Sequence, residues 1–265
     1  MKALRSDELL PRATEQLKSE GTPEEETKKS KAKSIVQSLT VLAVASVFSF
    51  DLIFSDFGNT NILPHFIYGL ILFYAIFTLS QSQRTKILLS AMAGAFTLAA
   101  IITHLLTSRF FEKYDYIYLL YSTSAKRYYL PVKIAAVFEL IAVLALLTVC
   151  VIAFREFTKE NTAFSPDDEK YGMTSKKCHD SLIRRGTVMF SMAGLINLLK
   201  CINVFLKGNV KLAFSAVNEE GFATGTLPWM STLIFGLCVI YVIYSFYFIS
   251  DVKGEVRLKY DTENE

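Results

Sequence analysis

The chain has 265 residues and a formal net charge of +3; 52% of its residues are hydrophobic and 13% aromatic. Its mean hydropathy of +0.34 is too high for an ordinary soluble domain, and its polar segments lack the basic clusters with interleaved aromatics that nucleic-acid readers use. We therefore predict an integral membrane protein that contacts the lipid bilayer and binds no nucleic acid.

Six apolar runs are long enough to cross a bilayer core, which takes about 20 helical residues. Each run is continuous, whereas the strands of an outer-membrane barrel alternate in polarity, so helices are favoured over strands. The sequence thus predicts an all-α, polytopic fold with six transmembrane helices. These helices are placed at residues 34–55, 63–80, 87–107, 131–154, 187–206 and 227–249.

Short recurrences predict an internal repeat. A Leu-Pro pair stands at the start of three apolar runs, and proline suits the first turn of a helix because its missing N–H would have no partner there. The tripeptide at 92–94, Met-Ala-Gly, recurs at 192–194. Both observations favour three tandem helical hairpins. The Leu-Pro pairs are Leu63-Pro64, Leu130-Pro131 and Leu227-Pro228, and the hairpins are residues 34–80, 87–154 and 187–249.

The polar segments predict the orientation. Most Lys and Arg residues beside the span ends belong to the tail 1–33, the loop 155–186, the tail 250–265 or the connection between the second and third spans. Positive residues concentrate on the cytoplasmic side, so we predict that both termini and this loop are cytoplasmic. The acidic and then basic composition of the N-terminal tail predicts partial disorder. The compact spans without processing signals favour a bacterial inner (plasma) membrane.

Ionisable residues inside the spans are the candidate functional residues. Asp51, His65, His104, Glu139 and Lys200 lie within apolar runs or at their edges, all in the outer half under this topology. Charge in hydrocarbon is expensive, so such residues usually face the bundle interior, form pairs or line water. For Asp51 and His65, a position at the membrane interface is the alternative, and Lys200 is long enough to reach the interface from its helix.

Glu139 and a stripe on the fifth predicted helix form the candidate substrate-binding set. Asn197, Lys200 and Asn203 follow one another at three-residue spacing, which places them along one side of a helix. A pair between Glu139 and Lys200 would neutralise both charges. The sequence does not indicate whether their two helices are neighbours. The full candidate set is Glu139, Lys200, Asn197, Asn203, His104 and Asp51.

Enzyme signatures are absent from the sequence. It contains no Gly-x-Ser-x-Gly elbow, no His-Glu-x-x-His, no phosphate loop and no dinucleotide-binding glycine pattern. Cys178, His179 and Asp180 are adjacent on a predicted loop and would point apart, so we assign them no catalytic or metal role. We expect no cofactor and no metal, and an enzyme is the least favoured class. The other cysteines, Cys150, Cys201 and Cys238, are interpreted as small buried hydrophobes.

Two functional classes follow from these patterns. A small transporter or channel-like protein would bind a polar or charged small solute in an outward-facing pocket, with the aromatic segment 109–121 as a gate. A non-catalytic membrane subunit or scaffold would instead use its small residues for close helix packing against a membrane-protein partner or a second copy. An intramembrane enzyme of unfamiliar type ranks behind both. Transport requires Glu139 and Lys200 to face a shared cavity, whereas a scaffold permits them to face different neighbours.

Overall fold

The computed structural model describes residues 23–48, 65–113, 123–162, 172–207 and 228–262, and in this part of the chain every regular element is a helix. The prediction of an all-α fold is confirmed. The helices are α2 (Pro23–Val47), α4 (Phe66–Leu79), α5 (Gln83–Lys113), α7 (Thr123–Asn161), α8 (Gly172–Lys207) and α10 (Pro228–Thr262).

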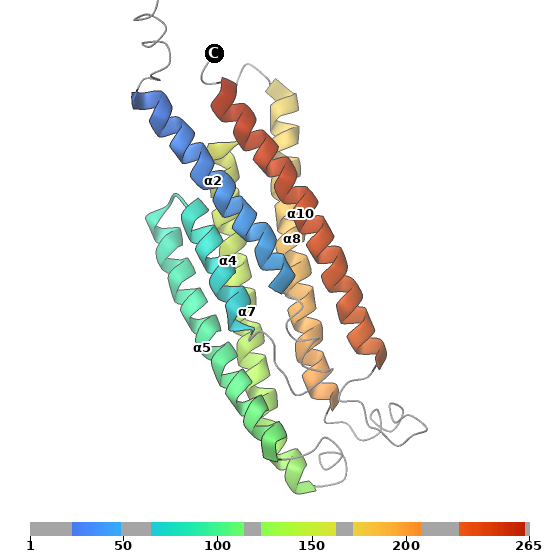
Figure 1. Cartoon of the computed structure of the whole chain (residues 1–265). Coiled ribbons are helices and arrows are strands. Elements are labelled where there is room, and N and C mark those ends of the chain that lie inside the picture. Colours follow the sequence, from blue (N-terminus) through green and yellow to red (C-terminus); the bar gives the residue numbers. More distant parts are fainter. Residues whose placement is uncertain (1–22, 49–64, 114–122, 163–171, 208–227, 263–265) are drawn as a thin grey trace, which may run out of the picture.

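The six helices form a closed bundle. Each one packs against the next along the chain, α10 packs against α2, and α4 also contacts α7. Figure 1 shows that the start of α2 and the end of α10 lie at the same end of the bundle. Away from this end, α2 stops and α4 begins part of the way along the bundle, whereas α5, α7, α8 and α10 continue past them. We call the half away from these chain ends, which holds Thr123 of α7 and Lys207 of α8, the distal half.

Among the described residues, four helices are long and apolar enough to cross a membrane. Many large apolar side chains on these helices are exposed, for example Phe138 on α7 and Tyr247 on α10. Exposed apolar surface of this extent fits contact with lipid. α4 is apolar but shorter, so the count of six spans, the tandem hairpins and the orientation remain predictions. The four apolar stretches are Gln83–Thr107, Leu130–Asn161, Cys178–Phe205 and Thr232–Tyr260.

The residues at which the helices begin contradict one prediction from the sequence. Pro228 opens α10 as predicted, but Pro131 lies inside α7, which begins at Thr123. The prediction that the Leu130-Pro131 pair begins a helix is therefore wrong. Pro131 lies in the helix interior, where a proline removes one backbone hydrogen bond and its ring crowds the carbonyl four residues earlier, so α7 tolerates this cost at Pro131. The Leu63-Pro64 pair lies outside the described residues.

Several helices extend beyond the predicted spans into segments predicted to be loop or tail. α7 continues to Asn161 and α8 begins at Gly172, so helix replaces most of the predicted 155–186 loop. α10 likewise covers most of the predicted C-terminal tail. α2 begins at Pro23 and includes the second part of the predicted N-terminal tail. The local reason at α2 is a proline in the first turn followed by three glutamates, a combination that favours a helix start.

Polar contacts join the helix ends near the two chain termini. The Tyr260 hydroxyl donates to Asn161 Oδ1 over 3.2 Å, and Asn161 Nδ2 donates to the Phe157 carbonyl over 3.2 Å. Lys259 Nζ donates to the Glu160 carbonyl. Asn161 is buried, so its amide depends on these partners. The contacts fix the end of α10 against the end of α7, which explains why these helices extend past the predicted spans 131–154 and 227–249.

We expect Tyr260→Phe to lower the free energy of unfolding by about 1 kcal/mol, because the change leaves the buried Asn161 oxygen without this donor. Reversible unfolding of the purified protein in mixed micelles measures the effect. Tyr247→Phe is the matched control, since Tyr247 is 72% exposed and its replacement should change little. Equal effects at the two positions would show that the Tyr260 contact contributes nothing.

Candidate functional site

Glu139 points into the bundle from a stretch of α7 that also carries exposed apolar side chains. Its neighbour Phe138 is 63% exposed, whereas the Glu139 side chain is only 13% exposed. The carboxylate is paired, because His65 Nδ1 lies 2.5 Å from Glu139 Oε1. The His65 side chain is also buried, at 9% exposed. A largely buried hydrogen bond between a carboxylate and an imidazole therefore connects the start of α4 to the distal half of α7.

Aromatic rings hold the His65 imidazole in place. The ring stacks on Tyr68 with a centroid separation of 5.9 Å and meets the edge of Phe96 of α5 at 5.2 Å. Gly69 makes room for Phe96, since a Cβ at Gly69 would lie 2.2 Å from Phe96 Cε1. Packing among α4 and α5 thus fixes the orientation of the imidazole that Glu139 contacts.

Two further helices contribute to the environment of the Glu139 carboxylate. Lys200 of α8 attracts it electrostatically, and Thr103 of α5 lies near it, with the Thr103 hydroxyl donating to the Ala99 carbonyl over 3.0 Å. Cys201, next to Lys200, is also close enough to Glu139 to interact with it electrostatically. α7 and α8 pack against each other, which answers the question that the sequence left open. The direct hydrogen-bonded partner is nevertheless His65, and groups from α4, α5, α7 and α8 converge here.

The polar stripe predicted on the fifth span lies on α8. Asn197, Lys200 and Asn203 are each only 7% exposed, so all three side chains face the protein rather than lipid. Asn197 Nδ2 donates to the carbonyl of Ala193 one turn earlier, over 2.8 Å. The Asn203 amide oxygen is buried and has no hydrogen-bond partner within the described ranges. A buried amide oxygen without a protein partner is a place for a water molecule or a polar group of a solute.

The remaining candidate residues have separate positions. Asp51 lies outside the described residues. His104 is partly buried on α5, immediately after Thr103, and takes part in further interactions. His65 and Thr103 are absent from the predicted set, because His65 stands at the edge of an apolar run, a position also typical of the membrane interface, and Thr103 carries no charge. The available signal for His65 was its position at the start of the second apolar run, directly after Pro64.

Between the Glu139–His65 pair and the end of the bundle that carries the chain termini, side chains fill the interior. The Tyr68 and Tyr241 hydroxyls, on α4 and α10, lie 3.4 Å apart and are buried. Beyond them the interior is filled by an aromatic cluster in which the Phe154 ring lies 6.0 Å from that of Phe190 and 5.6 Å from that of Phe248. The polar groups around Glu139 are therefore separated from the end of the bundle that carries the termini by packed aromatic rings.

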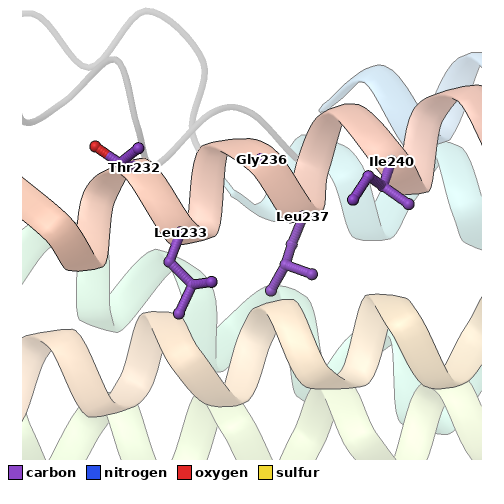
Figure 2. A pocket seen from close by; sticks show the side chains of 5 residues that line it. All are labelled: Thr232, Leu233, Gly236, Leu237 and Ile240. Atoms are coloured by element: carbon purple, nitrogen blue, oxygen red, sulfur yellow. The ribbon is translucent and has the colours of Figure 1, made fainter.

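A shallow pocket among the described residues lies elsewhere and is apolar. Figure 2 shows its lining on α10, with Leu233 and Leu237 pointing toward the neighbouring helix. None of the predicted site residues lines it, and Thr232 is its one polar side chain. The pocket fits contact with lipid chains better than solute binding. It is lined by Thr232, Leu233, Gly236, Leu237 and Ile240.

The reactive residue types do not assemble into a metal site within the described ranges, where no group of three His, Cys, Asp or Glu side chains could hold an ion. Cys178, His179 and Asp180 lie in α8, which corrects the prediction that they belong to a loop. Cys150, Cys201 and Cys238 are buried in helices, as expected of small hydrophobes.

The described fold is that of an all-helical protein with four apolar helices able to cross a membrane, which is the class of an integral membrane protein. Comparison with protein families, curated proteins and solved structures gave no match.

Proposed function

We propose that this protein is a small multi-pass transporter or channel-like protein that binds a polar or charged small solute in the distal half of its bundle. The observation that carries the proposal is the hydrogen bond between the Glu139 carboxylate and the His65 imidazole, both largely buried inside an apolar helix bundle. Ionisable groups inside membrane helices are costly to bury, and they usually mark the path of a solute or proton.

The surroundings of the pair support a solute site. Polar groups approach it from several helices, and the buried stripe on α8 supplies an amide oxygen with no described protein partner. The aromatic cluster closes the other half of the interior. A polar region closed at the end of the termini fits a pocket that opens at the distal end. In the proposed orientation both termini are cytoplasmic, so the pocket opens outward from a bacterial inner membrane.

Thiol labelling tests the proposal. Glu139→Cys, Asn197→Cys and Lys200→Cys, each in a background without the four native cysteines, are treated with a membrane-impermeant thiol reagent from the outside. We expect labelling at all three positions, because a solute pocket must admit water. Leu146→Cys is the matched control: Leu146 is on α7 like Glu139 but fully buried in the apolar core, and it should stay unlabelled.

Protection of all three positions, in protein shown to be inserted and monodisperse, would contradict a water-filled outward pocket. Labelling of the Leu146→Cys control as well would mean that the bundle is open or unfolded, and the labelling pattern would then count against the proposed pocket.

A membrane subunit or scaffold is the second candidate, favoured by one face of α5. Ala91 and Gly94 are exposed there, and nothing lies within 4 Å of a Cβ built on Gly94. Small residues on an exposed helix face permit close approach of a second helix, from a membrane-protein partner or another copy. The equivalent Gly194 is used internally, since its Cβ would lie 3.2 Å from Leu144 Cδ2. Oxidative cross-linking of Gly94→Cys in membranes would detect a homo-oligomer through this face.

A further inference from the structure

The balance of charge in the distal half favours negative solutes. Within the apolar stretches of the described helices, this half holds one carboxylate, Glu139, and two ammonium groups, Lys133 and Lys200. Lys200 is buried, and Lys133 lies over the Phe205 ring of α8 at 5.6 Å. Lys133 stands about 9 Å farther out along α7 than Glu139, by the rise of an α-helix. Both cations therefore belong to the distal half: Lys200 is near Glu139, and Lys133 is closer to the distal end of α7.

The start of α4 adds positive potential at the same place. The first N–H groups of any α-helix have no intrahelical acceptors, and the helix dipole is positive at this end. α4 has no side-chain cap and no acidic residue in its first turn. Glu139 is brought to this helix start by its bond to His65. The carboxylate thus lies against an imidazole at the start of a helix, and an ammonium group attracts it from α8. Cationic groups and a helix N-terminus are the chemistry of an anion site.

We propose that the solute is a small anion that exchanges places with the Glu139 carboxylate. This inference rests on the proposed transport function and specifies its substrate class. When Glu139 takes up a proton, its negative charge is lost and the position next to His65 and Lys200 can accept the solute anion. Each anion then enters together with one proton. The Asn203 amide, one turn from Lys200 on the same stripe, accepts a hydrogen bond from a hydroxyl or water molecule carried by the anion.

The groups around Glu139 determine whether anion entry increases or decreases with pH. They are His65 on α4, Thr103 on α5, and Lys200 and Cys201 on α8. The acid at the centre of this group is Glu139, so acidification favours anion entry by neutralising the competing carboxylate.

Proteoliposomes that contain a trapped pH-sensitive dye test the inference. Inward gradients of potassium chloride, potassium phosphate and potassium succinate, with valinomycin to clamp the potential, are compared with gradients of choline and of xylitol. We expect at least one anion to acidify the lumen and isotopically labelled anion to accumulate. Lys200→Met should lower both signals at least tenfold, and Lys200→Arg should retain a signal because it keeps the charge. Glu139→Gln should abolish acidification while labelled anion still enters.

Lys86→Met is the matched control, because Lys86 lies at the opposite end of α5 over the Phe77 ring and should leave both signals unchanged. Signals only with choline or xylitol would overturn the anion class and leave the transport function standing. No acidification and no uptake of any solute would overturn the transport function together with the inference. Uptake that is equal in Lys200→Met and the unaltered protein would show that Lys200 does not bind the solute.

Discussion

Replacing Glu139 with leucine is expected to lower the free energy of unfolding by about 3–5 kcal/mol, one of the two largest effects anticipated for this chain. The reason is that the substitution leaves two largely buried groups without the carboxylate that they interact with. His65 loses its hydrogen-bonded partner at 2.5 Å, and Lys200 loses the carboxylate that attracts it. Reversible unfolding in mixed micelles at neutral pH measures the loss.

A double-mutant cycle separates the pair from general packing. His65→Phe keeps an aromatic ring against Tyr68 and Phe96. The double variant His65→Phe/Glu139→Leu should be clearly more stable than the sum of the single losses predicts, because no unpaired member of the pair remains. Additive effects of the two substitutions would mean that His65 and Glu139 contribute independently to stability and do not act as a pair.

Ile141→Leu is the control on the same stretch of α7, since the Ile141 side chain is 59% exposed on the lipid side. A conservative change there should alter the free energy of unfolding by less than about 0.5 kcal/mol, as is usual for exposed positions. A large effect at Ile141 would indicate that this stretch of α7 is generally sensitive, and the loss at Glu139 would then carry no special information about the pair.

Several features of the fold follow from the sequence because they depend on local pattern. Continuous apolar runs are enough to predict helices, and helices cover most residues of each predicted run that the structure describes. The three-residue spacing of Asn197, Lys200 and Asn203 is enough to predict a shared face, and all three are buried. The ends of the helices are harder to predict, because polar residues such as those after Phe154 are typical of a loop. In the folded protein, contacts such as that of Tyr260 with Asn161 favour continuation of the helix.

The partner of Glu139 could not be predicted, because pairing depends on which helices are neighbours and at what height. The sequence suggested Lys200 by charge alone. The actual bonded partner, His65, comes from a helix that begins part of the way along the bundle, so a residue at the edge of an apolar run lies deep beside α7. Hydropathy assigns a depth to each residue from its distance to the run's end, and this assignment fails for a helix such as α4 that starts inside the bundle.

The second large effect is expected at Gly69, where alanine should lower the free energy of unfolding by about 3 kcal/mol. A Cβ at this position would lie 2.2 Å from Phe96 Cε1 and 2.3 Å from Phe96 Cδ1, well inside contact distance. Phe96 is fully buried and touches the His65 ring with its edge, so it cannot move without disturbing the imidazole that binds Glu139. Thermal unfolding in detergent, together with thiol labelling of Glu139→Cys in the same background, measures both consequences.

Gly94→Ala is the matched control, since Gly94 is also a helical glycine but nothing lies within 4 Å of the added methyl group. Alanine has the higher helix propensity, so this change should leave stability unchanged or raise it by up to about 1 kcal/mol. Phe96→Leu in the Gly69→Ala background should recover part of the loss, because a smaller side chain makes room for the methyl group. If Gly69→Ala is as stable as the unaltered protein, α4 and α5 are not packed closely enough for Phe96 to position His65, and the site must obtain its geometry from Glu139 alone.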